Sequence, residues 1–171
     1  MAPLSLVINL SYSRSFLLAD DYENCMITAK DQIDLYPRYA SHYVTLGYAL
    51  LGQNKNDEAV AAFEKAVDLE RTGQTLSALG FAYAISGKPS KAITLVKELE
   101  QRYPSHKALG REIAAVYAGL GNYDKTFSWL EADLRSRSTE LSTIRYLPPF
   151  RSMHNSPKFR EILRRMGLPQ N

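Results

Sequence analysis

Residues 43–63 read YVTLGYALLGQNKNDEAVAAF, and residues 76–96 read LSALGFAYAISGKPSKAITLV. The two stretches begin 33 residues apart, and similar residue types recur at the same places in both, so that Leu46-Gly47 corresponds to Leu79-Gly80. Self-similarity at a fixed period of this size is typical of stacked structural repeats. The chain is therefore expected to repeat one supersecondary unit.

Each repeat contains two apolar stripes at helical spacing, separated by a short polar turn, and is predicted to be a helical hairpin. Small residues recur where two helices must approach closely, with Gly47 expected to face Ala59 and Ala66, and Gly80 to face Ala92. The period continues more weakly in both directions along the chain. This gives four repeats with the approximate bounds 6–39, 40–72, 73–106 and 107–140, followed by a C-terminal extension over 141–171.

One hairpin cannot bury its apolar face alone, so the stability of such a chain must come from stacking. Composition agrees with an ordinary globular chain, since 45% of the residues are hydrophobic and 23% are charged. The predicted fold is therefore all-α and comprises a single domain over residues 1–171. It is expected to be a right-handed solenoid of about four helix-turn-helix hairpins with a C-terminal capping helix.

The two central repeats resemble the tetratricopeptide repeat family, whose pattern of Leu-Gly, Tyr, Ala, Phe and Pro at set offsets they match best. In that family the first helix of each hairpin lines a concave surface that binds partners. The resemblance implies a groove lined by Arg14 of the first repeat, by Val44, Tyr48 and Leu51 of the second, by Gln74, Ser77, Phe81 and Ile85 of the third, and by Arg111 and Glu112 of the fourth.

Tyr48 and Phe81 are the candidate anchors for a partner. No role inside their own hairpins is evident from the sequence, and aromatic side chains often dominate interface energetics. The alternative is that neighbouring first helices or the C-terminal tail cover them. The carboxylate clamp of the family needs lysines at positions that Leu10 and Val44 occupy here, so binding of chaperone tails is not expected. An amphipathic helix or an extended apolar peptide fits the apolar and aromatic lining of this groove better.

The C-terminal segment carries a second resemblance. The stretches Tyr146-Leu-Pro-Pro-Phe150 and Ser156-Pro157-Lys-Phe159 look like the tail of repeat modules in bacterial winged-helix regulators, adenylate-cyclase-like proteins and Ser/Thr kinases. Ser156 and Pro157 predict the start of a helix. This helix is expected to dock on the last hairpin as a cap, or alternatively to pair with a second copy as a homodimer. The face concerned consists of Phe159, Ile162, Leu163 and Met166.

Sequence patterns for catalysis, metal binding or cofactor binding are missing, including nucleotide-binding glycine loops and paired-cysteine sites. His42, His106 and His154 are far apart and fall near expected helix starts or in loops, where solvated or capping roles are expected. The single Cys25 excludes an internal disulfide and fits a reducing compartment. We therefore expect no enzyme activity, no catalytic residues, no metal, no cofactor and a cytoplasmic location.

Charge is distributed unevenly along the chain. From Leu134 onward there are eight Lys or Arg against two Asp or Glu, whereas the whole chain has a formal charge of +3. Such asymmetry can steer acidic partners. Arg164 and Arg165, however, are explained by compensation of a helix dipole, and nucleic-acid binding is not expected. The apolar stretch from Leu4 to Leu10 is too short for a membrane span.

The sequence therefore predicts a non-catalytic protein–protein interaction module that binds a peptide or helix in a concave apolar and aromatic groove. The alternative is a sensor or dimerisation module of a larger bacterial signalling or transcriptional regulator. Because repeat folds accept many unrelated partners, specificity is expected to reside in a few groove residues.

Overall fold

The computed structural model describes the backbone of residues 4–135 and 144–168, with side chains from Leu10 onward. No strand occurs in these ranges, and the helices pack in consecutive pairs, so the predicted all-α fold of helical hairpins is confirmed. The chain divides into two compact units, an N-terminal unit over residues 1–75 and a C-terminal unit over residues 76–171. The predicted end of the fourth repeat at Glu140 and the start of the extension at residue 141 lie outside the described residues.

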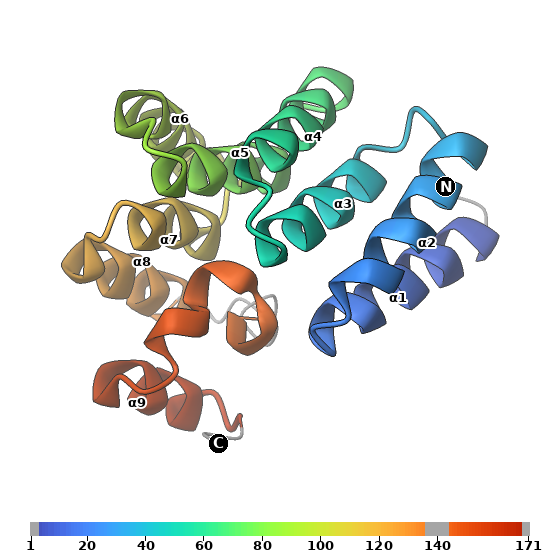
Figure 1. Ribbon diagram of the computed structural model, residues 1–171. Coiled ribbons are helices and arrows are strands. Elements are labelled where there is room, and N and C mark those ends of the chain that lie inside the picture. Colours follow the sequence, from blue (N-terminus) through green and yellow to red (C-terminus); the bar gives the residue numbers. More distant parts are fainter. Residues whose placement is uncertain (1–3, 136–143, 169–171) are drawn as a thin grey trace. The chain divides into compact units, whose positions relative to one another are not determined.

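The N-terminal unit contains two hairpins and the start of a third. Its helices are α1 (Leu4–Leu18), α2 (Tyr22–Leu35), α3 (Ala40–Gly52) and α4 (Asn56–Leu69), and α5 (Gly73–Ile85) begins at its end (Figure 1). α1 packs on α2, α2 on α3 and α3 on α4, and α1 also contacts α3. Leu17, Cys25 and Ala49 are buried together where α1, α2 and α3 meet. This three-helix contact holds the first helices of successive hairpins side by side.

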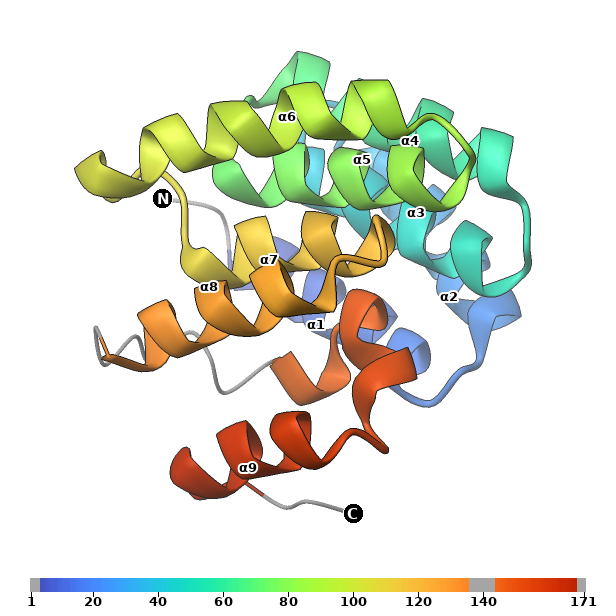
Figure 2. The same cartoon turned by 90° about the vertical axis from the view of Figure 1, so that its left-hand side faces the viewer.

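The C-terminal unit contains most of α5, then α6 (Pro89–Arg102), the 3-10 turn η1 (Tyr103–Ser105), α7 (Gly110–Gly119), α8 (Tyr123–Arg135), η3 (Pro148–Met153) and α9 (Pro157–Arg165). The helix α7 packs on α8, on α6 and on η3, and α9 packs on α8. In both Figure 1 and Figure 2, α9 lies at the opposite end of this unit from α6. The last helix therefore covers the end of the last hairpin.

The turn after each first helix has the same backbone conformation in all four hairpins. Asp20, Asn54, Gly87 and Gly121 have φ angles of 58°, 61°, 71° and 71°. A single left-handed residue ends a helix by redirecting the chain. Glycine adopts this conformation freely, whereas Asp and Asn tolerate it better than most other residues. The backbone thus repeats at these positions even where the residue type has changed.

The small residues of the first helices make room for side chains other than those expected. A Cβ atom on Gly47 would lie 2.6 Å from the ring of Phe63 on α4. On Gly80 it would lie 2.8 Å from Cγ2 of Val116 on α7, in the next hairpin. The closest neighbour of Gly80 is therefore in the next hairpin, while Cβ of Leu95 on α6 of the same hairpin would lie 3.6 Å away; that Gly80 faces Ala92 stays a prediction.

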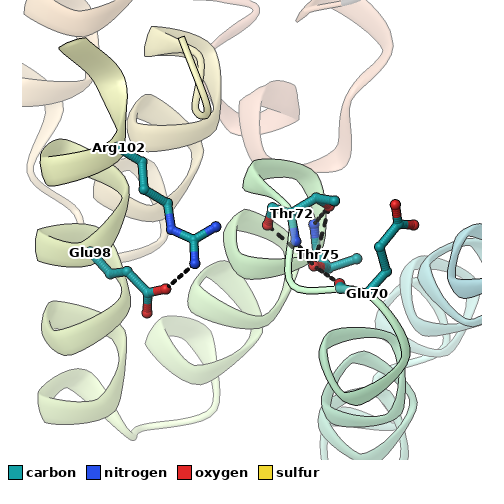
Figure 3. A network of polar contacts seen from close by, with 5 residues as sticks. All are labelled: Glu70, Thr72, Thr75, Glu98 and Arg102. Atoms are coloured by element: carbon teal, nitrogen blue, oxygen red, sulfur yellow. Dashed lines mark hydrogen bonds and ion pairs between the residues drawn. The ribbon is translucent and has the colours of Figure 1, made fainter. Parts of the chain in front are cut away.

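Local polar contacts fix the connections and the helix surfaces (Figure 3). In the turn between α4 and α5, the Thr75 hydroxyl donates to the Glu70 carbonyl at 2.6 Å and accepts from the Thr72 N–H at 3.0 Å. Such side-chain bonds to the backbone hold a turn in one conformation. On α6, Arg102 donates to the Glu98 carboxylate at 2.7 Å, one helical turn away, which supports that helix.

Candidate functional site

The first helices of the hairpins in the N-terminal unit are almost free of charge. The helices α1 and α3 carry one formally charged side chain between them, Arg14 on α1. The ten Asp and Glu side chains of residues 1–75 lie on α2, on α4 or in connecting segments. We call the accessible side chains of Arg14 on α1, of Tyr39 directly before α3, and of Tyr48 and Leu51 on α3 the first-helix face. It combines one cation with two tyrosine rings and a leucine.

Arg14 is exposed, and no hydrogen bond or ion pair joins it to any described residue. Surrounding protein atoms nevertheless desolvate the guanidinium group, which lowers the pKa of Arg14, while the nearby Tyr39 and Tyr48 act in the opposite direction. The group stays charged at physiological pH. As an exposed side chain, Arg14 remains accessible to water and to a partner.

His42 on α3 is completely buried, with 0% of its surface exposed. Neither ring nitrogen has a hydrogen-bond partner within the described ranges. The ring packs edge-to-face against Tyr39, with ring centres 4.8 Å apart. Burial, and then the charge of Arg14, lower the pKa of His42. The imidazole is therefore held neutral, with one buried donor and one buried acceptor unsatisfied.

The expectation that His42 has a solvated or capping role is wrong. It shares its buried side of α3 with Thr45 and Ala49, which follow at positions i+3 and i+7. This helical spacing was the sequence signal for burial. The signal is weak because histidine is intermediate between buried and exposed residue types.

The predicted groove residues of α3 differ in accessibility. Val44 is buried, with 3% of its surface exposed, whereas Tyr48 and Leu51 are half-buried. The Tyr48 ring packs edge-to-face on Phe63 of α4, with ring centres 5.1 Å apart. The idea that Tyr48 has no role inside its own hairpin is therefore wrong. The Tyr48 ring supports the α3–α4 contact, and only part of the side chain is accessible to a partner.

The predicted groove residues of α5 in the C-terminal unit mainly hold α5 against α7. Phe81 is 9% exposed, and its ring occupies the space left by Gly119 on α7. The Ser77 hydroxyl donates to the Glu112 carbonyl at 2.8 Å. Phe81 is therefore not a free anchor, and the alternative of cover by a neighbouring first helix describes it correctly.

The remaining groove candidates are more accessible. Gln74 is exposed, Ile85 is 41% exposed and Arg111 is half-buried. The Glu112 carboxylate accepts from the Leu109 N–H at 2.8 Å and so caps α7. The structure brings the candidates together in two sets, one within each unit, with Arg14 and Tyr48 in the first and Ser77 and Glu112 in the second.

The apolar face of α9 is covered by its own chain. Phe159, Ile162 and Leu163 are at most 2% exposed, and Met166 is partly buried against the same cluster. The Phe159 ring stacks on that of Phe150, with centres 6.1 Å apart. This face contributes to the core of the C-terminal unit and is not free for a second copy.

Comparison with known proteins gives one family. The family model described as tetratricopeptide repeat matches residues 40–72, which comprise α3, α4 and the connection to α5. The predicted resemblance to this family is confirmed there, while the resemblance of the tail to bacterial regulators stays a prediction. A search of curated proteins found no match. Among the described residues, no helix is long and apolar enough to cross a membrane, and no three His, Cys, Asp or Glu side chains are grouped for a metal ion.

Proposed function

We propose that this protein is a non-catalytic protein interaction module that binds a peptide or helical segment of its partner on the first-helix face. Tetratricopeptide repeats generally mediate protein–protein interactions, and residues 40–72 match such a repeat. Solenoid repeats bind partners over extended surfaces instead of in a closed catalytic pocket. The match therefore supports binding as the function of this surface.

The observation that carries the proposal is the composition of the surface beside α3. Tyr39, Tyr48 and Leu51 are half-buried there, and the exposed Arg14 lies on α1, which packs on α3. Aromatic residues and Arg are enriched at the centres of protein interfaces, whereas Lys and Glu are depleted. Because Val44 is buried, the partner contacts Tyr48, Leu51 and Arg14 and does not reach deeper into the unit.

Site-specific photo-crosslinking tests this function. A benzophenone amino acid is placed at Leu51 of the full chain, and the control carries it at Lys65, an exposed residue of α4. In lysate of the source organism, we expect a discrete crosslinked protein from position 51 that excess unlabelled chain competes away, and no such product from position 65. Identical products from both positions, or none from position 51, would refute binding on the first-helix face.

A further inference from the structure

The last helix, α9, has one buried apolar side and one exposed charged side. Its apolar side chains pack into the C-terminal unit, at the end of the unit that lies opposite α6 (Figures 1 and 2). The exposed side consists of charged residues that are three, four or seven positions apart and therefore share one side of the helix. We call it the α9 outer face, and it is formed by Lys158, Arg160, Glu161, Arg164 and Arg165.

One of the four cations of the α9 outer face is neutralised within the part of the chain that the structure describes. Arg164 donates two hydrogen bonds to the Glu161 carboxylate, both at 2.8 Å. Arg160 makes one long hydrogen bond of 3.4 Å to the Asn155 carbonyl, which carries no net charge. No described carboxylate forms an ion pair with Arg165. The face therefore keeps an excess of positive charge.

The helix dipole explains only part of this excess. Cations are favourable near the C-terminal end of a helix, which accounts for Arg164 and Arg165, and are unfavourable in its first turn. Lys158 nevertheless lies in the first turn of α9, which contains no acidic side chain. Its ammonium group lies over the ring of Phe127 on α8, 4.9 Å from the ring centre, and this contact adds no negative charge. Departures from local rules of this kind are expected at functional sites.

The neighbouring helix α8, on which α9 packs, does not neutralise the face either. The Asp133 carboxylate is buried and accepts from the N–H groups of Gly110 and Arg111 on α7. Glu131 forms its ion pair with Arg135, at 3.9 Å. Over residues 144–168 the chain has six Lys or Arg against one acidic residue. The charge that complements the α9 outer face therefore has to come from a partner.

We propose that the α9 outer face binds an acidic segment of a partner protein, whose carboxylates pair with Lys158, Arg160 and Arg165. This is a second interaction surface, on the C-terminal unit, whereas the first-helix face belongs to the N-terminal unit. The planar fork of an arginine matches a carboxylate in a bidentate geometry. Lys158 and Arg165 are separated by about 10 Å along the helix axis. Two carboxylates that lie two turns apart on a helix of the partner have the same spacing.

The composition of the face favours a polypeptide over a nucleic acid or a membrane. A phosphate backbone carries closely and regularly spaced charges and would bring some of them against Glu161, whereas a polypeptide can place a neutral residue there. The exposed side of α9 has no aromatic residue on which a base would stack. It also has no large apolar side chain that would enter a bilayer.

The size of the effect follows from the strength of exposed ion pairs. Each such pair changes an affinity about two- to fivefold. Replacing both Arg160 and Arg165 by Gln should therefore weaken binding of an acidic segment about five- to 25-fold. Glu161→Gln should have the opposite effect, because it removes a carboxylate from the face and releases Arg164. We expect it to tighten binding about two- to fivefold, a gain that a purely structural role of this ion pair does not predict.

The test is an NMR titration of the full isotope-labelled chain at low ionic strength, where exposed ion pairs are least screened. The probe is an acetylated and amidated helical peptide of Ala and Gln with two Glu residues two helical turns apart. The comparison probes are the same peptide with Gln in place of Glu, a thymidine trinucleotide of the same charge, and vesicles of phosphatidylcholine and phosphatidylserine. The signals followed are the backbone amides of α9.

Three variants accompany the natural chain, each checked for folding by circular dichroism. The first is Arg160→Gln with Arg165→Gln, and the second is Glu161→Gln. The third is a charge-matched control, Lys30→Gln with Lys65→Gln, which replaces two exposed lysines on α2 and α4.

We expect saturable shifts of the α9 amides with the Glu peptide, and binding that is about five- to 25-fold weaker for the Gln peptide and for the double arginine variant. Binding should be unchanged in the lysine control and tighter in Glu161→Gln. Equal binding of the two peptides, equal binding by the double arginine variant and the natural chain, or no binding of the Glu peptide overturns the proposal. Tighter binding of the trinucleotide, or vesicle binding that the double arginine variant loses, overturns it as well. The crosslinking test at Leu51 concerns the other unit, so the two proposals fail separately.

Discussion

Asp133 on α8 forms hydrogen bonds to the start of α7, and we predict that removing its carboxylate destabilises the fold. The side chain is 1% exposed, and its two oxygens accept from the backbone N–H groups of Gly110 and Arg111, both at 2.7 Å. Helix starts have N–H groups without partners inside the helix, and an anion there also complements the helix dipole. Asp133 therefore accepts hydrogen bonds from two N–H groups at the start of α7 that have no acceptor within the helix itself.

The magnitude follows from these two bonds and from the cost of burying the carboxylate. Hydrogen bonds to charged groups contribute about 1.5–3 kcal/mol each, so the pair contributes about 3–6 kcal/mol before that cost. Burial raises the pKa of Asp133 although both N–H bonds act against it, so the cost of burial offsets part of this contribution. We expect Asp133→Ala to lower the free energy of unfolding by about 3 kcal/mol. For a chain of 171 residues this corresponds to a fall in Tm of about 6–12 °C.

Urea and thermal unfolding followed by circular dichroism measure this loss, and hydrogen exchange of the Gly110 and Arg111 amides localises it. Asp133→Asn keeps the shape and one strong acceptor, so it should lose roughly half as much. The control is Glu131→Ala on the same helix, whose ion pair with Arg135 at 3.9 Å is partly exposed and contributes little. A loss below about 0.5 kcal/mol in Asp133→Ala, or amides that stay protected, would refute the reasoning.

Three further predictions concern buried positions. His42→Leu should raise the free energy of unfolding by about 1–2 kcal/mol, because it removes two unsatisfied buried nitrogens; destabilisation in urea would reveal a hidden partner. Gly80→Ala should cost about 1–3 kcal/mol, because the new Cβ meets Val116 at 2.8 Å, and an unchanged urea midpoint would contradict this. Burial raises the pKa of Cys25 to about 11, so at pH 8 iodoacetamide should react roughly 100-fold more slowly with the folded chain than with the chain in urea. Equal reaction rates in the folded chain and in urea would contradict this. The raised pKa of Cys25 also means that its neutral thiol stabilises the fold below the ordinary pKa of 9.0, and that this stabilisation is lost as the pH rises through about 11.

Sequence reasoning reached the helices of this protein because a helical period needs only local information. The apolar stripe of α4 packs mainly on α3, so the pattern of Ala59, Phe63 and Ala66 directly reports which side of α4 is buried. The recurrence of the motif every 33 residues then predicts that the units are alike. The hairpins and their turns can therefore be predicted without knowing which distant residues are in contact.

The groove was harder to predict, because a first helix in a stack contacts several neighbours at once. On α5, Phe81 packs against Gly119, 38 residues further along the chain, and no local pattern indicates that pairing. The expectation that Phe81 is accessible failed for this reason. The burial of His42 was not predicted for a similar reason. Since α3 is apolar on most sides, its few polar residues do not indicate which side is exposed.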